Sequence, residues 1–176
     1  MQNAPAQLRK PQATLRRPES EDGSAIWELI QACKPLDENS LYCNLIQCDH
    51  FSDTCVVAEL EGEIVGWVSA YLLPQDAETL FVWQVAVSEK ARGLGLGSQM
   101  LNHLFDRDVC AGADRMQTTI TRDNAASWNL FRKFAQKRGG NLSSQAHFTE
   151  ALHFEGRHDT EYMVTIDMSQ AMKKAA

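Results

Sequence analysis

The segment Val85–Ser98 reads VAVSEKARGLGLGS, an apolar run that leads into a glycine-rich loop and then into the start of a helix. Gly93, Gly95 and Gly97 carry no Cβ, so the backbone of this loop can approach an anion closely. The first turn of a helix adds unpaired N–H groups and a partial positive charge. Arg92 adds a fixed cation beside them. The segment therefore predicts a pyrophosphate-binding loop between a buried strand and a helix.

The spacing of the glycines excludes two common phosphate-binding loops. A P-loop ends in a lysine followed by serine or threonine, and no lysine follows Gly97 at that distance. A dinucleotide-binding loop needs G-x-G-x-x-G, and counting from Gly93 places Ser98 where the last glycine belongs. The remaining R-x-x-G-x-G pattern resembles the coenzyme A pyrophosphate loop of the GCN5-related N-acetyltransferase superfamily. A glycine-rich turn that binds no ligand is the alternative interpretation, and the flanking strand and amphipathic helix argue against it.

A second segment, Asp123–Phe131, reads DNAASWNLF and resembles the helix beside the pantetheine arm in the same superfamily. The resemblance implies that Asn124 bonds the arm and that Phe131 packs near the thioester, on a helix that Asp123 can cap. A capped helix with an apolar core face is a second, compatible interpretation. Many superfamily members have a tyrosine at the position of Phe131. That tyrosine is thought to protonate the leaving thiolate. Phenylalanine has no proton to give, so another group or a water must supply it.

The two resemblances together imply acetyl-CoA as co-substrate and a defined set of coenzyme contacts. The backbone of the strand before the loop would contact the acetyl group, and the loop would hold the pyrophosphate. The implied coenzyme-binding residues are Val85, Ala86, Val87, Arg92, Gly93, Leu94, Gly95, Leu96, Gly97, Ser98, Asn124 and Phe131.

The periodicity of the remaining chain predicts an α/β fold with a mixed, mostly antiparallel β-sheet flanked by helices. Three consecutive strands form a meander, and the second half contains a parallel β-α-β crossover. This pattern agrees with the acetyl-CoA-dependent N-acetyltransferase (GNAT) fold that the resemblance implies. We expect a disordered leader at residues 1–13, an N-acetyltransferase domain at 14–168 and a flexible tail at 169–176. Strands are expected near 14–17, 54–60, 64–73, 79–87, 115–120, 142–148 and 161–168, and helices near 20–33, 39–48, 96–109 and 123–135.

Composition limits the class of protein. The 176 residues have a net charge of −6 and a hydrophobic fraction of 44%, which are typical of a soluble domain and argue against nucleic-acid binding. No segment approaches the ~20 apolar residues that span a bilayer, and no signal-peptide core stands near the N-terminus. The five cysteines form no C-x-x-C pair and no metal-like cluster. We therefore expect a cytoplasmic protein with reduced thiols, no metal ion and no membrane partner.

Three further stretches narrow the resemblance: 35–45 (PLDENSLYCNL), 50–59 (HFSDTCVVAE) and 76–87 (DAETLFVWQVAV). They are similar to the L-2,4-diaminobutyrate acetyltransferases of ectoine synthesis, and the similarity covers about residues 14–167. It implies transfer of an acetyl group from acetyl-CoA to the side-chain (N4) amine of 2,4-diaminobutyrate. It also implies a cytoplasmic homodimer that makes the precursor of a compatible solute.

The implied acceptor carries two positive charges and one carboxylate, so its binding site should offer anions and aromatic faces. Asp37 could hold an ammonium group, and Tyr42 could contribute a hydroxyl and a ring. Trp83 could cover the substrate by a cation–π contact beside the acetyl group. Plainer interpretations stay open, because Asp37 could only cap a helix and Trp83 could belong to the core.

The polar turn Glu155–Asp159 between the last two strands offers further candidates. Glu155 and His158 could supply polar contacts, and Arg157 could bind the carboxylate of the acceptor. A turn that is merely solvated is the alternative. The complete set of candidate substrate-binding residues is Asp37, Asn39, Tyr42, Trp83, Glu155, Arg157 and His158.

The reaction requires removal of a proton, because an alkyl amine with a pKa of about 10 is mostly protonated at neutral pH. Tyr42, Asp37 and Glu155 are the candidates for this catalytic role, directly or through a water. The neutral amine then attacks the thioester, and backbone N–H groups of Val85–Val87 stabilise the oxyanion. Two other functions stay open: acetyl transfer to another small amine such as a polyamine, and a non-catalytic acetyl-CoA-binding module, which the missing tyrosine at Phe131 would favour.

Overall fold

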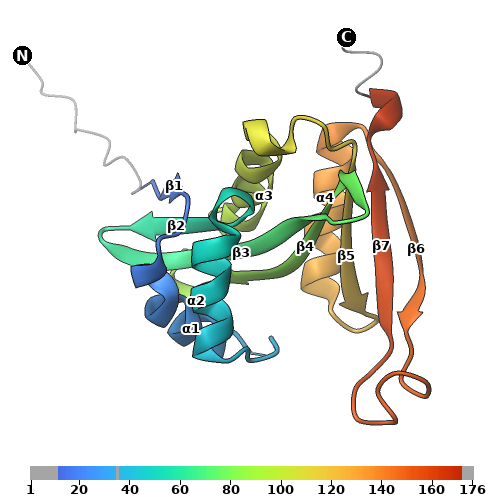
Figure 1. Cartoon of the computed structure of the whole chain (residues 1–176), viewed down its shortest axis with the longest axis horizontal. Helices are drawn as coiled ribbons and strands as arrows, with labels where there is room; N and C mark the ends of the chain where they lie inside the picture. The colour runs from blue at the N-terminus through green and yellow to red at the C-terminus, as the bar shows by residue number, and fades with distance from the viewer. Residues whose placement is uncertain (1–11, 35, 172–176) are drawn as a thin grey trace, which may run out of the picture.

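The computed structural model describes residues 12–34 and 36–171, and seven strands there form one sheet in the order β1-β2-β3-β4-β5-β7-β6 (Figure 1). The pairing of β4 with β5 is parallel, and every other neighbouring pair is antiparallel. The predicted α/β fold with a mixed, mostly antiparallel sheet is confirmed. The strands are β1 (Thr14–Arg16), β2 (Val56–Leu60), β3 (Glu63–Leu73), β4 (Asp76–Val87), β5 (Arg115–Thr121), β6 (Asn141–Phe148) and β7 (Glu161–Asp167).

Strands β2, β3 and β4 form the expected meander. Glu61 and Gly62 connect β2 to β3, and both have positive φ, at 53° and 82°. Consecutive residues with positive φ give a tight hairpin turn whose twist matches that of the flanking strands. In β3 six consecutive residues from Val65 to Ala70 are buried. A strand buried on both faces indicates that both sides of the sheet are covered at this point.

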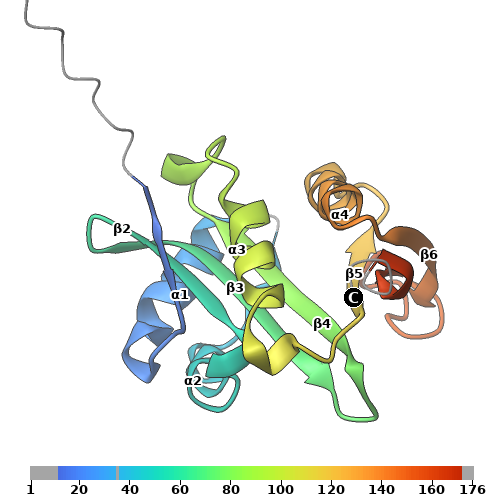
Figure 2. The same cartoon turned by 90° about the horizontal axis from the view of Figure 1, so that it is seen from above.

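Helices supply that cover, and each face of the sheet has two of them (Figures 1 and 2). Helices α1 (Gly23–Ala32) and α2 (Leu41–His50) lie against one face, and α3 (Leu96–Phe105) and α4 (Ala125–Arg138) lie against the other. Helix α3 also provides the crossover that makes β4 and β5 parallel. The predicted β-α-β unit is therefore present.

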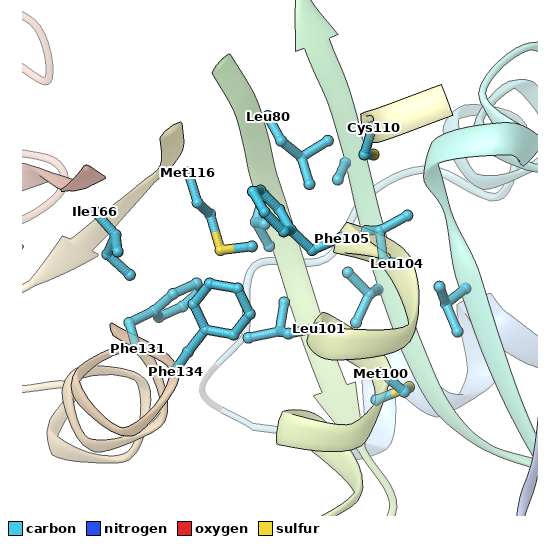
Figure 3. Packing of buried hydrophobic residues seen from close by; sticks show 14 of the residues in the cluster. Leu80, Met100, Leu101, Leu104, Phe105, Cys110, Met116, Phe131, Phe134 and Ile166 are labelled. Carbon is cyan, nitrogen blue, oxygen red and sulfur yellow. The ribbon is translucent and has the colours of Figure 1, made fainter. Parts of the chain in front are cut away.

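The larger core lies between the sheet and the helices α3 and α4. Figure 3 shows Leu101, Leu104 and Phe105 of α3 pointing toward Phe134 of α4 and Met116 of β5. The rings of Phe105 and Phe134 meet edge to face, with 5.9 Å between their centroids, a favoured arrangement for aromatic pairs. A second core on the other face of the sheet is built around one tryptophan and the apolar sides of α1 and α2. Its buried members are Ile26, Leu29, Ile30, Cys33, Cys48, Cys55, Val57, Trp67 and Ala86.

Two helix starts differ from the prediction. Residues 20–22 form a 3-10 turn and α1 begins only at Gly23, because the carboxylate of Asp22 is held by Arg16 at 2.7 Å. The cap of α4 is Asn124 rather than Asp123, so that prediction was wrong. The side-chain oxygen of Asn124 accepts a hydrogen bond from the backbone N–H of Ser127 at 3.0 Å, which satisfies one free donor of the helix start.

Helix α3 is shorter than predicted and ends at Phe105 instead of near residue 109. The side chain of Arg107 turns toward the loop before β2, where it donates to the backbone carbonyls of Asp53 and Cys55 at 3.0 and 2.7 Å. Residues 108–110 then form a separate 3-10 turn. The sequence pattern continued apolar through this region, so periodicity alone did not show the break.

Most of the predicted leader and tail lies outside the described residues, which exclude 1–11 and 172–176. Ala13 packs against the larger core, and residues 169–171 form a helical turn. The division into a leader at 1–13, a domain at 14–168 and a tail at 169–176 stays a prediction.

Replacing Phe134 with alanine should lower the free energy of unfolding by about 3–5 kcal/mol. Phe134 is fully buried between α3, α4 and the sheet, and removing a large ring leaves a cavity that the surrounding side chains only partly fill. Urea denaturation followed by circular dichroism measures the loss. The matched control is Lys133→Ala on the same helix, because Lys133 is exposed and its loss should change stability by no more than about 0.5 kcal/mol. Equal losses in the two variants would contradict this account of the core.

Candidate active site

The glycine-rich loop has the geometry that an anion-binding loop requires. Gly93 and Gly95 have positive φ, at 79° and 70°, a conformation that favours glycine. Gly95 is also the N-cap of α3, and no described side chain caps this helix start. A Cβ on Gly97 would lie 3.4 Å from Leu130 of α4, so the loop packs closely against that helix. The free N–H groups of the first turn of α3 are thus held in a fixed position.

Beside this loop, β4 and β5 separate. Backbone pairing between the two strands is limited to Thr79–Phe81 of β4 and Arg115–Gln117 of β5. The register between β3 and β4 shifts after Ser69, so that Trp83 has no partner in β3 and forms a β-bulge. A bulge bends its strand and increases the local twist. Residues 82–87 of β4 therefore leave one backbone edge available to a ligand, next to the glycine-rich loop.

A cavity of about 760 Å³ opens where the two strands separate. This volume lies within the usual range for small-molecule sites. Its walls come from the ends of β4 and β5, the start of α4, the loop before α2 and the connection between β6 and β7. The lining includes residues 82–85, 118–121, 123–127 and 156–159, together with Leu36, Asp37, Asn39, Phe131, Glu150 and Glu161.

The loop before α2 is tied to β4 by a buried amide. The side-chain N–H of Gln84 donates to the backbone carbonyl of Asp37 at 2.9 Å, and its oxygen accepts from the side chain of Asn39 at 3.3 Å. These bonds place both Asp37 and Asn39 at the cavity. Ser40, and not Asp37, caps α2, since its hydroxyl accepts from the backbone N–H of Cys43 at 3.1 Å. The carboxylate of Asp37 is therefore not needed as a helix cap.

Trp83 faces the cavity instead of the core. As the bulged residue of β4 it is 50% exposed and forms part of the cavity wall. The tryptophan that fills the core is Trp67, which is completely buried. The exposed indole gives the cavity the flat apolar surface on which a cation can stack.

Glu161 is the most deeply placed carboxylate of the cavity, with 17% of its side chain exposed. Its Oε2 atom is buried and has no hydrogen-bond partner among the described residues. Burial raises the pKa of Glu161, while the nearby His158 acts in the opposite direction. Thr119 and His158 interact with this carboxylate, but one buried oxygen left without a partner costs free energy, so its presence in a cavity indicates a site for a cationic ligand.

His158 lies between Glu161 and Asp37. Its Nε2 atom is 3.9 Å from a carboxylate oxygen of Glu161 and 3.8 Å from one of Asp37. The hydrogen bond from Nδ1 to the carbonyl of Asp159 is the largest cause of a raised pKa at His158, and the carboxylates of Asp37 and Glu161 add to it. The loop before α2 thus meets the connection between β6 and β7 across the cavity.

The structure does not bring Tyr42 and Glu155 to the cavity lining. Tyr42 is 71% exposed on the first turn of α2. Glu155 points into solvent and forms an ion pair with Arg157 at 3.0 Å, in which both side chains are largely exposed. Arg157 borders the cavity although Glu155 does not. The assignment of Tyr42 and Glu155 as catalytic residues stays a prediction without support from their positions.

The predicted coenzyme contacts divide into two groups. Val85, Asn124 and Phe131 line the cavity, with Phe131 almost completely buried behind it. The stretch from Arg92 to Ser98 lies outside the cavity lining and forms the loop at the start of α3. Val87 packs on the larger core and Ala86 on the smaller one, so these two side chains face away from the gap between the strands and only their backbone is available to a ligand.

The cysteines are not placed for catalysis. All five are free, and Cys33, Cys48, Cys55 and Cys110 are buried. Burial raises the pKa of Cys48 and Cys55 to about 12, which keeps the thiols protonated. Among residues 12–34 and 36–171 no three His, Cys, Asp or Glu side chains are grouped to hold a metal ion. In the same described ranges no helix is long and apolar enough to cross a membrane.

Sequence reasoning missed several residues of the cavity. Glu161 and Gln84 fell inside predicted strands and were counted as ordinary strand residues, and the Asp123 carboxylate was assigned only to a helix cap. Three threonines that line the β5 side were also overlooked. A usable signal existed in Glu161, an acidic residue at the start of a strand whose next residues, 162–164, are Tyr, Met and Val. The additional cavity residues include Gln84, Thr118, Thr119, Thr121, Asp123, Glu150, Asp159 and Glu161.

A family model described as the acetyltransferase (GNAT) family matches residues 23–135, a range that includes the glycine-rich loop and most of α4. The chain belongs to the acetyltransferase (GNAT) family. The GNAT fold predicted from the loop is confirmed, and with it the use of acetyl-CoA as co-substrate. In this GNAT chain the cavity lies beside the exposed edge of β4, and the glycine-rich loop follows the end of the same strand.

Similarity to individual proteins is strong over nearly the whole chain. An L-2,4-diaminobutyric acid acetyltransferase from Vibrio cholerae is 49% identical over 156 residues, 89% of this chain and 90% of the relative. One from Methylotuvimicrobium alcaliphilum is 46% identical over 93% of this chain and 95% of the relative. The diaminobutyrate acetyltransferase EctA from Paenibacillus lautus, solved in complex with its substrate L-2,4-diaminobutyric acid and coenzyme A, is 38% identical, with a TM-score of 0.86 over 90% of this chain and 96% of that one. The predicted resemblance to diaminobutyrate acetyltransferases is confirmed.

Replacing Gly95 with alanine should strongly weaken binding of coenzyme A. A Cβ there enters the loop in a backbone conformation that strains L-residues by about 1–2 kcal/mol. Isothermal calorimetry on the folded variant measures the affinity. The matched control is Gly62→Ala in the β2–β3 turn, where φ is also positive and the space is also open. That variant should lose similar stability and keep its coenzyme affinity. Unchanged affinity in Gly95→Ala would contradict the assignment of the loop.

Proposed function

We propose that this GNAT acetyltransferase transfers the acetyl group of acetyl-CoA to the N4 amine of L-2,4-diaminobutyrate, giving N4-acetyl-L-2,4-diaminobutyrate in ectoine biosynthesis. The observation that carries the proposal is the charge of the cavity beside the open edge of β4. Five carboxylates border it, those of Asp37, Asp123, Glu150, Asp159 and Glu161. A diamine with two positive charges fits such a site, and a neutral or anionic acceptor does not. The similarity to diaminobutyrate acetyltransferases supports the same acceptor.

The two ends of the cavity differ in what they can bind. Glu161 lies inside with little exposure, and a cation placed beside it would gain a partner for an otherwise unpaired oxygen. Arg157 is exposed at the rim, where its guanidinium can pair with the carboxylate of the acceptor. Trp83 can stack on the substrate between these groups. With Asp37 holding the α-ammonium at the mouth of the cavity, this arrangement fixes that group and the carboxylate and leaves the side-chain amine beside Glu161 and β4.

The attacking amine must lose a proton before it can form the new C–N bond. Glu161 is the carboxylate best placed to accept it, because burial raises its pKa and so makes it a better base than an exposed acid. Asp37 is the second candidate, at the same cavity but 83% exposed. The nitrogen lone pair then attacks the thioester carbonyl, and backbone N–H groups at the open edge of β4 stabilise the oxyanion. When the C–S bond breaks, the thiolate takes a proton from water, since Phe131 has none to give, and the hydroxide left behind removes the second proton of the attacking nitrogen to give the neutral amide.

We infer in addition a cytoplasmic homodimer. Strand β6 forms one edge of the sheet, and its residues are almost all exposed. Phe148 at its end and Leu152 in the following connection are exposed apolar side chains. Natural proteins usually protect such edges, and a second copy of the chain would do so here.

With acetyl-CoA, the protein should acetylate L-2,4-diaminobutyrate at N4. Release of free thiol measures turnover, and NMR of the product shows which nitrogen carries the acetyl group. Analogues with one carbon more or fewer in the side chain, and a polyamine, serve as comparison substrates. We expect the highest kcat/KM for 2,4-diaminobutyrate, because holding its α-ammonium and carboxylate fixes the distance from the side-chain amine to the thioester. Preference for a polyamine, or mainly N2-acetyl product, would contradict the proposal. Coenzyme binding without turnover on any amine would indicate a non-catalytic module.

Replacing Glu161 with glutamine should raise the KM for the diamine by about 10-fold or more, because a charge-assisted hydrogen bond contributes about 1.5–3 kcal/mol. The kcat should fall as well, because glutamine cannot accept the proton of the attacking amine, and the KM for acetyl-CoA should change little. Steady-state kinetics with each substrate varied in turn separate the two constants. Asp37→Asn should give a smaller effect in the same direction, since Asp37 is largely exposed. The control Glu63→Gln removes an exposed carboxylate paired with Lys90 at 2.7 Å and should change neither constant. Equal changes in both KM values would indicate a folding defect instead.

A further inference from the structure

The protonation of His158 is coupled by geometry to the two carboxylates of the acceptor site. A backbone carbonyl can only accept a hydrogen bond, so the 2.7 Å contact between Nδ1 of His158 and the carbonyl of Asp159 means that Nδ1 carries a proton. Nε2 is therefore the nitrogen that gains or loses a proton near neutral pH. It faces Asp37 at 3.8 Å and Glu161 at 3.9 Å.

The charged groups that act on His158 within the described residues are all acidic: Asp37 from the loop before α2, Glu161 from β7 and Asp159 from its own segment. Its neighbour Arg157 is directed to Glu155 instead. The ring of Phe154 contacts the imidazole at a tilt of 43°, with 4.7 Å between centroids. The surroundings thus favour the protonated ring, and the pKa of His158 is raised, with the Asp159 carbonyl as the first cause and partial burial as the opposing one.

An imidazolium between two carboxylates has the same charge environment that an alkylammonium ion needs. Both contacts are long, and the Asp37 side chain is largely exposed. Ion pairs of this kind contribute little stability, so a ligand cation that reaches the same oxygens can replace them. Two cations cannot share the same pair of carboxylates without repulsion. Substrate binding and protonation of His158 should therefore exclude each other.

We propose that protonated His158 stands in for a substrate ammonium group between Asp37 and Glu161, and that the diamine displaces this charge as it binds. The Nε2–H bond breaks, its proton passes to the solvent, and the neutral imidazole keeps its Nδ1–H bond to Asp159. The diamine enters with its own protons and makes new ion pairs with both carboxylates. The inference rests on the proposed function, because it takes the diamine as the ligand of this cavity.

The affinity for the diamine should fall as the pH drops below the pKa of His158. Below the pKa of His158 the ring is charged, and the diamine must displace a proton to bind. Only the neutral fraction is competent, so the apparent dissociation constant should rise about tenfold for each pH unit below that pKa. Above the pKa no proton is displaced and the affinity becomes constant, until the amines of the ligand begin to lose their own protons.

Calorimetry on the full chain saturated with coenzyme A, which allows binding without turnover, tests the inference. L-2,4-diaminobutyrate is titrated between pH 6 and 7.5 in buffers of different ionisation enthalpy, and the difference in heat gives the number of protons released. The wild type should release close to one proton per diamine at the acidic end. His158→Gln, which retains a polar side chain but cannot titrate, should release less and lose most of the pH dependence of its affinity. The control His50→Gln removes an exposed imidazole beside Asp49 and should behave as the wild type.

NMR of the imidazole C–H signals in the wild type gives a readout that needs no variant. The pKa of His158 should fall when the diamine is added to the coenzyme complex. An unchanged or increased pKa would overturn the inference, because it would mean that His158 stays charged and pairs with the substrate carboxylate. That result is compatible with normal N4-acetyl transfer, so the proposed function would survive it. Absence of diamine binding together with absence of acetyl transfer would instead reject the proposed function itself.

Discussion

Parallel pairing between β4 and β5 stops at Phe81 and Gln117. Beyond this point the bulge at Trp83 directs β4 away from its neighbour, and the sheet opens into a gap. The gap exposes backbone groups of β4 on one edge and creates room for a cavity of about 760 Å³. The glycine-rich loop follows β4 directly, so coenzyme and acceptor approach the same strand from different directions. If the two strands were paired along their full length, neither site would exist.

The packing around the gap keeps it open. Helices α3 and α4 pack against one face of the sheet through the core shown in Figure 3. Helices α1 and α2 pack against the other face around Trp67. Phe131 is part of the larger core and also of the cavity wall. The contact between Gly97 and Leu130 joins the coenzyme loop to α4. Core packing thus fixes the separation of the strands and the orientation of the loop together, because protein interiors are close-packed and deform little.

The cavity is polar and acidic in a protein whose net charge is only −6. Its carboxylates come from the loop before α2, the β5–α4 connection and the β6–β7 segment. Bringing like charges together costs free energy, and leaving Glu161 half-satisfied costs more. A folded protein retains such an arrangement when a ligand supplies the missing charge. The charge pattern therefore accounts for selectivity toward a diamine more directly than the shape of the cavity does.

The elements of the fold and the coenzyme loop were predictable from the sequence, because they depend on local properties: apolar periodicity within each strand and helix, and glycines whose positive φ follows from their own neighbours in the chain. Asp37, Asn39, Trp83, Arg157 and His158 were also recognised as candidates and do reach the cavity. The tertiary structure alone decided that Glu161 is the inner carboxylate, that Gln84 holds the Asp37 loop and that Tyr42 points to solvent. The reason is physical: β7 lies between β5 and β6, which places Glu161 and His158 opposite a loop more than one hundred residues away in the chain. No local pattern encodes that meeting, because it depends on the order of the strands in the sheet.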